Sequence, residues 1–378
     1  MDGFVADTHN DLLMAVAARP VERWGAFFAE RWLPQLRDGG VGVQVLPVFV
    51  DNREYQESAL RTTLRTVECA HRIAEHCADD VALCRDGAEI DTALAAGRIA
   101  LVLALEAAPG VDRDVELLTT LYRLDVRVAS LVHYGRTALA DGSGEDEAAR
   151  GRLTRAGIAA LAEMERLGMI FDVSHLGAAG VAHVLELATR PVMATHSSAR
   201  ALCDHHRNLT DDQLRAVAAT GGVVCVNFYP PFLAADPSTA TLDTLADHIA
   251  HIASVAGIDH VGLGPDFMTD VMTDLLPHWC EAEEASSTWD IRTPLPGVPG
   301  PRGFPAVAKN LAERGFSPEH QAKIMGGNVT ALFRTELGRP ARPSPDPCVS
   351  PPPDLARINA PLPRVASRRR LALEAGLA

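Results

Sequence analysis

The stretch Phe4-Val5-Ala6-Asp7-Thr8-His9-Asn10-Asp11 is a short apolar run that ends in a histidine and an aspartate two positions apart. In a β-strand, side chains two positions apart lie on the same face, so His9 and Asp11 would point toward one spot, as two ligands of a metal must. One such pair is weak evidence, because Asp11 could equally cap the helix that follows.

Three later strand-like runs also end on a residue that can bind a metal. They are Ile99 to Leu105 followed by Glu106, Ile170 to Ser174 followed by His175, and Val192 to Thr195 followed by His196. A single histidine at the end of a strand is more often a packing or capping residue than a ligand. The repetition along the chain favours a shared metal site over that structural reading.

The strand-like runs alternate with helical patterns. We expect the remaining strands at residues 41–50, 126–132, 223–227 and 260–264. Short and mostly apolar strands that alternate with helices predict an α/β fold, a (β/α)₈ TIM barrel of the metal-dependent hydrolase type. This fold places the C-terminal end of every strand on one face, where active sites of such barrels lie. An open doubly wound sheet is the alternative.

The predicted barrel domain covers residues 1–338 and carries two irregular segments. The first is an aromatic-rich insertion at 19–40, and the second is a flap at 267–303 that follows the last strand. Residues 339–378 are rich in proline, so we expect a C-terminal tail that lies outside the barrel.

Composition argues against several classes of protein. A formal net charge of −14 without a readable basic face argues against nucleic-acid binding. No apolar run reaches the roughly 18 residues of a membrane span, so we expect no membrane partner. The N-terminus shows no signal-peptide pattern and the cysteines form no CxxC pair, which predicts a cytoplasmic protein. The oligomeric state stays open, with a homodimer as one option.

The residue types of the ligand set indicate the metal. Imidazoles together with carboxylates suit zinc or a similar first-row ion. These ligands exceed one tetrahedral site, so two zinc ions that share a carboxylate are the economical arrangement, and Glu106 is the natural bridge. A modified lysine cannot bridge, because Lys309 and Lys323 lie beyond the last predicted strand. Two such ions would hold a bridging hydroxide and polarise a carbonyl, which predicts metal-assisted hydrolysis.

Four residues outside the ligand set suit substrate chemistry. Asp266 follows the last predicted strand and could orient the nucleophile or carry a proton to the leaving amine. His133 ends the predicted strand 126–132 and could stabilise an oxyanion. Arg207 could bind a substrate carboxylate bidentately, and Tyr229 could donate to the same centre. Each of the four also has a structural reading as a turn, surface or packing residue.

Several segments match a family of known proteins. They include Asp7 to Leu12, Leu103 to Glu106, Asp125 to Tyr134, Phe171 to His175, Thr195 to Leu202, His206 to Asp211 and Asn227 to Tyr229. In these segments the chain resembles the membrane dipeptidase (renal dipeptidase) family of zinc peptidases, whose fold is an amidohydrolase-like barrel. The resemblance covers about residues 4 to 335.

The resemblance implies a role for most of the candidate residues. It implies that two zinc ions are bound by His9, Asp11, Glu106, His175 and His196, with the glutamate as the bridge. It also implies that His133 contacts the oxygen of the scissile carbonyl, that Arg207 binds the substrate carboxylate and that Asp266 transfers a proton. The implied substrate is a dipeptide, often with a D-residue on the C-terminal side.

The chain departs from the family pattern near the substrate. Ala107-Ala108 replace the usual Gly-Gly, Met268-Thr269 replace Asp-Gly, and Gly327 replaces a glutamate. The leading hypothesis is a cytoplasmic dinuclear zinc dipeptidase. A related amidohydrolase that acts on a peptide-derived natural-product intermediate is the alternative. A metal-bound barrel without turnover is a third reading, against which the presence of the substrate residues argues.

Overall fold

The computed structural model describes residues 3–50, 58–145, 151–275 and 289–340. Nearly all of the predicted tail at 339–378 and the middle of the predicted flap at 267–303 lie outside these residues.

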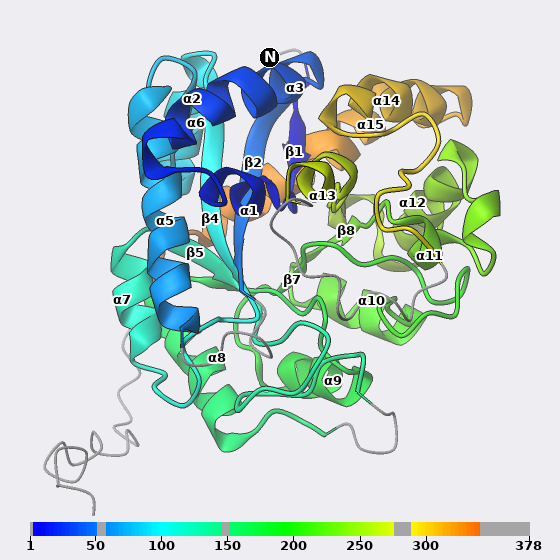
Figure 1. Ribbon diagram of the computed structural model, residues 1–378. Coiled ribbons are helices and arrows are strands. Elements are labelled where there is room, and N and C mark those ends of the chain that lie inside the picture. The colour runs from blue at the N-terminus through cyan, green and yellow to red at the C-terminus, as the bar shows by residue number, and fades with distance from the viewer. Residues whose placement is uncertain (1–2, 51–57, 146–150, 276–288, 341–378) are drawn as a thin grey trace, which may run out of the picture. The chain divides into compact units, whose positions relative to one another are not determined.

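Parallel strands form a nearly closed barrel (Figure 1). The strands of the barrel are β1 (Val5–Asp7), β2 (Val41–Phe49), β4 (Ile99–Glu106), β5 (Val126–Ala129), β6 (Ile170–Phe171), β7 (Met193–Ala194), β8 (Val223–Val226) and β9 (Val261–Leu263). Their order is β6-β5-β4-β2-β1-β9-β8-β7, and a parallel bridge between Asp172 and Met193 joins the two ends. The prediction of a (β/α)₈ barrel is confirmed.

One further strand, β3 (Val81–Leu83), was not predicted. It pairs with the first half of β4 while β5 pairs with the second half, so β3 and β5 share one edge of β4. A run of this length is too short to show an alternating pattern, and the helix that follows it, α6 (Gly87–Ala95), was also not predicted.

The predicted ends of the strands that precede the histidines were too late, by three residues for β5 and β6 and by one for β7. Strand β5 stops at Ala129, β6 at Phe171 and β7 at Ala194. His133, His175 and His196 therefore lie in the loops that follow these strands, not at their last positions. The physical reason is that the chain leaves the ladder and turns, as the positive φ of 70° at His175 shows.

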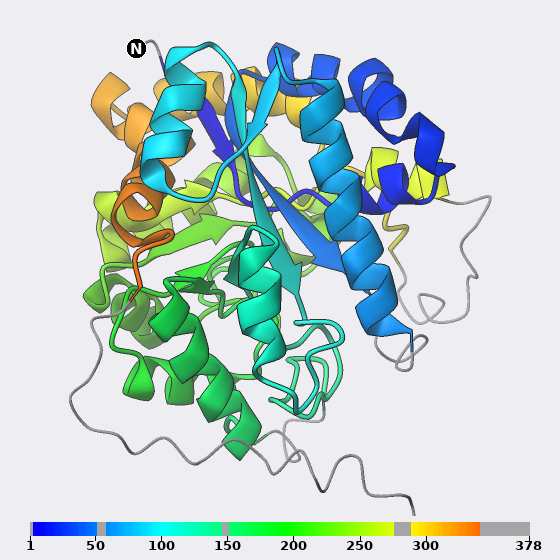
Figure 2. The same ribbon diagram turned by 90° about the vertical axis from the view of Figure 1, so that its left-hand side faces the viewer.

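Helices surround the barrel (Figures 1 and 2). They include α1 (Leu12–Ala17), α2 (Trp24–Phe27), α3 (Leu33–Asp38), α5 (Ala59–His76), α7 (Leu117–Arg123), α8 (Arg155–Leu167), α9 (Ala178–Leu187), α10 (Asp211–Ala219), α11 (Pro230–Leu233), α12 (Leu242–Ala256), α13 (Thr269–Leu275), α14 (Phe304–Glu313), α15 (Pro318–Ala322) and α16 (Asn328–Glu336). A capping box of Thr210 and Gln213 starts α10. Among the described residues, no helix combines the length and apolarity needed to cross a lipid bilayer.

The insertion and the start of the flap are held together by ion pairs. In the insertion, Trp24, Phe28 and Trp32 are fully buried. Arg31 binds Asp270 at 2.9 Å and Asp274 at 3.2 Å, both on α13. The first helix of the predicted flap is thus fixed to residues 19–40.

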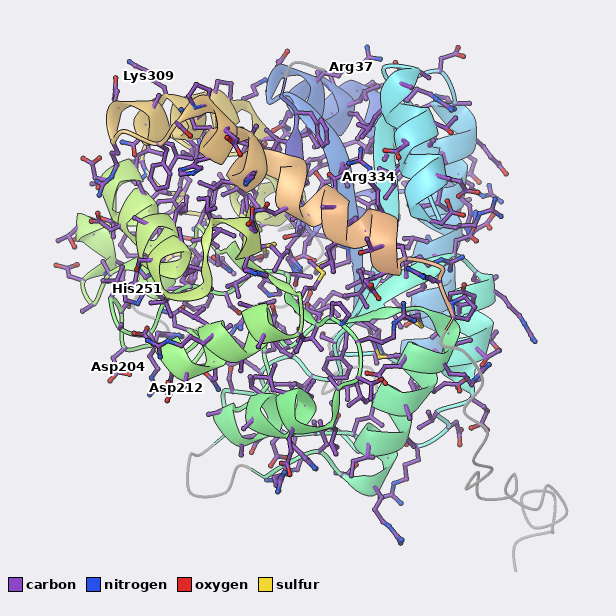
Figure 3. All side chains as sticks on the ribbon, turned by 180° about the vertical axis from the view of Figure 1, so that it is seen from behind. Arg37, Asp204, Asp212, His251, Lys309 and Arg334 are labelled. Atoms are coloured by element: carbon purple, nitrogen blue, oxygen red, sulfur yellow. The ribbon has the colours of Figure 1, made fainter. Side chains whose placement is uncertain are left out.

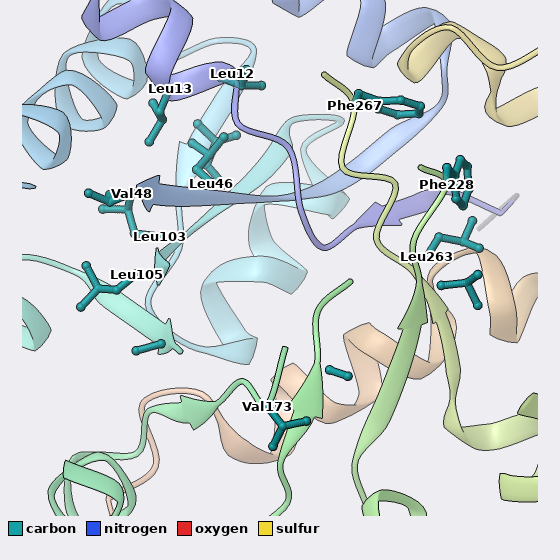
Figure 4. Close-up of a cluster of buried hydrophobic side chains, with 14 of the residues drawn as sticks. Leu12, Leu13, Leu46, Val48, Leu103, Leu105, Val173, Phe228, Leu263 and Phe267 are labelled. Atoms are coloured by element: carbon teal, nitrogen blue, oxygen red, sulfur yellow. The ribbon is translucent and has the colours of Figure 1, made fainter. Parts of the chain in front are cut away.

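Apolar side chains pack on both faces of the sheet, which explains the near-continuous apolar runs in the sequence. Alternate residues of β4 belong to different clusters: Leu103 and Leu105 pack in the cluster of Figure 4, with Leu46 and Val48, whereas Ala104 packs on the other face. Glu106 continues the row of Ala104, so the period of the strand directs its carboxylate away from the Leu105 cluster.

Candidate metal centre

The C-terminal ends of the strands and the loops that follow them bring the five predicted ligands, His133 and Asp266 into one cluster. The side chains form three groups, and the ligand atoms within each group lie within 4.8 Å of one another. The groups are His9, Glu106 and His196; His9, Asp11 and Asp266; and Glu106, His133 and His175. We call His9, Asp11 and Asp266 the acidic half of the cluster, and His133, His175 and His196 the imidazole half. Glu106 lies between the two halves.

The two carboxylate oxygens of Glu106 face different histidines. Oε2 lies 3.4 Å from His9 Nε2, whereas Oε1 lies 2.9 Å from His175 Nε2 and 3.9 Å from His196 Nε2. Oε1 is also 3.8 Å from His133 Nε2. One carboxylate therefore reaches both halves, as a shared ligand must.

The acidic half is built around β1 and the start of α1. Asp11 stands at the N-cap position of α1, but its side chain makes no capping hydrogen bond. Its Oδ2 lies 3.8 Å from His9 Nε2, and its buried Oδ1 has no hydrogen-bond partner among the described residues. Asp11 thus occupies the N-cap position without capping the helix through its side chain, and a bound cation would satisfy the orphaned oxygen.

Burial gives the acidic half unusual pKa values. Burial and the neighbouring Glu106 carboxylate raise the pKa of Asp11 well above its ordinary value. Burial opposes the charged form of His9, but Glu106 and Asp11 outweigh it and raise the pKa of His9 to about 10. The shifts show that these groups are crowded together in a buried place, and a divalent cation would relieve the repulsion among their carboxylates.

The imidazole half has the opposite character. Burial, with nearby positive groups, lowers the pKa of His175 and of His196 well below the ordinary value. Both rings are therefore neutral at physiological pH, the form that binds metals. Their Nε2 atoms lie within hydrogen-bond distance of each other, 2.7 Å apart, so the two possible ligand atoms converge on one spot.

Backbone hydrogen bonds position the acidic half. Asp7 accepts the N–H of His9 at 3.0 Å, and the N–H of Asp266 donates to the His9 carbonyl at 3.1 Å. The Thr8 hydroxyl shares its single hydrogen between the carbonyls of Thr195 (2.5 Å) and Leu263 (3.0 Å). The segment that follows β1 is thereby tied to β9 and to the end of β7.

Several residues that follow the C-terminal ends of the barrel strands have a left-handed backbone conformation. His175 has φ 70°, Asp266 φ 60°, Ala107 φ 68° and Ala108 φ 40°. For residues with a Cβ this conformation costs roughly 1–2 kcal/mol each. Such strain persists where the surrounding structure holds it in place, typically at functional sites. The two alanines adopt a conformation that glycine would adopt without strain.

The predicted substrate residues border the cluster. His133 is about one-third exposed, and its ring centroid lies 4.3 Å from that of His175. Arg207 is buried, donates from Nη2 to the His196 carbonyl at 3.1 Å and lies over the Phe232 ring. The surface reading of Arg207 is therefore wrong.

Tyr229 lies at the N-cap position of α11. Its ring packs edge-on against Phe232 with centroids 5.0 Å apart, and its backbone N–H donates to Asn227 Oδ1. Its predicted contact with the substrate stays a prediction.

Three buried polar residues near the cluster received no role from the sequence. Asn227 Nδ2 donates to Asp266 Oδ2 at 3.0 Å. Asp172 and Thr195 form hydrogen bonds behind His196. All three fall inside the segments that match the known family, but an amide, a carboxylate or a hydroxyl next to a strand is too common to indicate a role.

The lysines lie away from the cluster, as expected. Lys309 projects from the outside of α14 in Figure 3, is 76% exposed and pairs with Glu313. Lys323 pairs with Asp259 at 2.9 Å. Neither can supply a bridging ligand.

The chain is similar in sequence to proteins that are named as dipeptidases. The family model "Membrane dipeptidase (Peptidase family M19)" matches residues 2–279. Dipeptidase aclJ of Aspergillus oryzae is 32% identical over 309 residues, which cover 79% of this chain and 68% of that protein. An uncharacterized dipeptidase of Schizosaccharomyces pombe is 36% identical over 373 residues, 88% of this chain and 80% of that protein.

Solved structures share the fold. A crystal structure of "dipeptidase AC", a family M19 metallopeptidase, has a TM-score of 0.77 at 24% identity and covers 90% of this chain and 100% of that chain. A metallopeptidase of Rhodobacter sphaeroides, liganded with a phosphinate mimic of the dipeptide L-Ala-D-Ala, has a TM-score of 0.77 at 22% identity and covers 89% and 100%.

Proposed function

The chain belongs to the membrane dipeptidase family, peptidase family M19, and we propose that it is a dinuclear zinc dipeptidase. The observation that carries the proposal is the position of Glu106, whose two oxygens face the histidines of opposite halves. Imidazole nitrogen and carboxylate oxygen together suit zinc.

The ligands divide naturally between two ions. His9, Asp11 and Glu106 Oε2 would hold one ion, and His175, His196 and Glu106 Oε1 would hold the other. When bound, the pair of ions would supply a hydroxide at neutral pH and polarise the scissile carbonyl. The proposal is supported by the orphaned Asp11 oxygen on one side and by the converging neutral Nε2 atoms on the other.

His133 and Asp266 are proposed to handle the charge and the proton of the reaction. His133 reaches the Glu106 carboxylate from a partly exposed position, where its Nε2 could donate to an oxyanion that develops on the substrate. Asp266 shares a group with His9 and Asp11, and the Asn227 amide holds one of its oxygens. The other oxygen could take a proton and deliver it to the leaving amine.

Arg207 is proposed to select dipeptides over longer chains. A dipeptide carries its carboxylate one residue beyond the scissile amide, so a fixed cation near the metals would recognise it. Arg207 is buried and tied to the His196 carbonyl, which holds its guanidinium next to the imidazole half. Its buried Nε has no hydrogen-bond partner among the described residues and is available to a carboxylate.

An amidohydrolase reaction on a peptide-derived natural-product intermediate is the second candidate. The observation in its favour is the pair Ala107 and Ala108, both buried directly after Glu106, where the family pattern has glycine. The two methyl groups would reduce the space beside the bridging carboxylate and change the accepted substrate.

A substrate screen tests the proposal. Purified zinc-loaded protein is assayed against L,L and L,D dipeptides, tripeptides and C-terminally amidated dipeptides. We expect hydrolysis of free dipeptides, with L,D substrates included because a structural relative binds an L-Ala-D-Ala mimic. Hydrolysis of amidated and free dipeptides at equal rates would favour the second candidate. Both the cytoplasmic location and the homodimer stay predictions.

A further inference from the structure

A chain of buried polar groups lies behind the imidazole half. Asp172 and Thr195 are 5% and 2% exposed, and the proposed reaction gives neither of them a role. Thr195 Oγ1 lies 2.5 Å from Asp172 Oδ2 and 2.8 Å from His196 Nδ1. The threonine hydroxyl therefore connects a carboxylate to the far side of a proposed metal ligand.

In the series of hydrogen bonds from Asp172 through Thr195 to His196, the donor and the acceptor of each bond can be assigned. Asp172 Oδ1 accepts the backbone N–H groups of Ser174 and Thr195, both at 2.9 Å, which leaves Oδ2 to accept the Thr195 hydroxyl. A hydroxyl has a single hydrogen to donate. Since Thr195 donates it to Asp172, its oxygen can only accept from His196, whose proton must then lie on Nδ1.

We propose that Asp172 is a positioning residue which, through Thr195, holds His196 in the tautomer that leaves Nε2 free to bind zinc. That Nε2 faces the cluster, 2.7 Å from His175 Nε2 and 3.9 Å from Glu106 Oε1. The outer partner of a ligating histidine fixes its tautomer and ring orientation. The inference rests on the proposed metal centre.

The neighbouring ligand lacks this support. His175 Nδ1 is buried and has no hydrogen-bond partner among the described residues. Within the imidazole half, Asp172 and Thr195 thus act on His196. Loss of either side chain should change the tautomer and the zinc binding of His196.

Substitution of Asp172 by asparagine should exchange the donor and acceptor roles in this series of hydrogen bonds. The two backbone N–H groups that face Oδ1 require an oxygen at that position, so the new amide N–H₂ would face Thr195. Thr195 would then accept from the amide and donate to His196 Nδ1. The His196 proton would move to Nε2, the atom that must bind the metal.

Two substitutions of Thr195 distinguish the effect of its hydroxyl group from the effect of its packing. Thr195→Val removes the hydroxyl at nearly constant shape, whereas Thr195→Ser keeps it. Thr330→Val is the matched control, because Thr330 is also fully buried but its hydroxyl donates to the Gly326 carbonyl. A purely structural role predicts similar losses for both valine variants and no tautomer change.

The test measures zinc affinity by competition with a chromophoric chelator and the His196 tautomer by imidazole ¹⁵N NMR of the metal-free protein. We expect Thr195→Val and Asp172→Asn to bind zinc about 10- to 100-fold more weakly, with Thr195→Ser and Thr330→Val close to wild type. The wild type should show the Nδ1–H tautomer of His196, and Asp172→Asn the Nε2–H tautomer.

The outcomes distinguish the inference from the proposed function. An Nε2–H tautomer in the wild type, or wild-type affinity in both Thr195→Val and Asp172→Asn, would overturn the positioning role and leave the metal centre intact. Failure of the wild type to bind zinc would refute the metal centre itself. The wild-type NMR measurement decides even where a variant does not fold.

Discussion

The acidic and imidazole halves of the cluster meet at Glu106 but differ in charge and in support. The acidic half combines carboxylates with a histidine whose pKa is raised, and backbone hydrogen bonds to Asp7 and His9 hold it. The imidazole half holds neutral histidines, and the side chains of Asp172 and Thr195 support it. The acidic half offers carboxylate oxygens to a metal, and the imidazole half offers ring nitrogens.

This difference gives Glu106 two separate tasks. In the acidic half it is one of several carboxylates, and a cation there would relieve their mutual repulsion. In the imidazole half it is the carboxylate grouped with His175. Removal of Glu106 should therefore harm both halves, whereas other substitutions should harm one half more than the other.

Glu106→Ala should have the largest effect. Loss of the shared carboxylate removes a ligand from both proposed ions, so we expect kcat/KM for dipeptides to fall on the order of 10³-fold or more. Glu313→Ala, which removes an exposed glutamate on α14, is the control. Activity of Glu106→Ala within tenfold of that control would contradict a shared ligand.

Arg207→Ala should have the next largest effect, and it should act through the substrate. A bidentate guanidinium–carboxylate contact contributes on the order of 2–4 kcal/mol, so kcat/KM for free dipeptides should fall by roughly 30- to 1,000-fold. The loss should nearly vanish for amidated dipeptides, and zinc content should not change.

A matched control for Arg207 is available on β5. Arg127 is also buried, but its guanidinium donates to the carbonyls of Arg85 and Tyr122. Arg127→Ala should affect free and amidated substrates alike. The same pattern in Arg207→Ala would argue against recognition of the carboxylate.

Zinc binding should depend on pH more strongly in the acidic half than in the imidazole half. The pKa of His9 is raised to about 10 and that of Asp11 is raised well above its ordinary value, so a metal bound there must displace protons, and its affinity should rise with pH up to a pKa of about 10. The pKa values of His175 and His196 are lowered, so binding at neutral pH displaces no proton from these two rings.

Calorimetry in buffers of different ionisation enthalpy measures this proton release between pH 6 and pH 8. We expect more protons to be released in one binding step, that of the acidic half, than in the other. Equal proton release in both steps would remove the proposed difference between the halves.

Ala107→Gly should have the smallest effect on the free energy of unfolding, and that effect should be stabilising. Relief of the left-handed conformation at φ 68° should outweigh the greater freedom of glycine in the unfolded chain, a gain of about 0.5–1 kcal/mol. Ala100→Gly on β4, where the backbone is extended, should instead lower stability. Thermal unfolding of both variants checks the prediction, and a loss in both would show that Ala107 is not strained.

The sequence allowed the barrel and the cluster of ligands to be predicted because both depend on residue type and period. Apolar runs such as 99–105 require burial on both faces, and parallel strands with common ends bring Glu106 close to His9. The position of β3 could not be predicted, because Val81–Leu83 is too short for a pattern and its edge of β4 is shared with β5.

The residues that hold the ligands in position could not be predicted from patterns in the sequence either. The role of Thr195 depends on which atoms its hydroxyl meets, and any strand-end threonine would look the same in the sequence. His133 lies beyond the end of β5, so only the path of the loop brings it to Glu106. The strained Ala107 and Ala108 resemble ordinary strand residues until their φ values are known.

Metal stoichiometry tests the shared-carboxylate centre most directly. Metal-free protein is saturated with zinc, freed of excess and measured by elemental analysis, for the wild type and for Glu106→Ala. We predict about two zinc equivalents per wild-type chain and a clear loss in the variant. A wild-type value near one after saturation, or an unchanged value in Glu106→Ala, would contradict a pair of zinc ions bridged by Glu106.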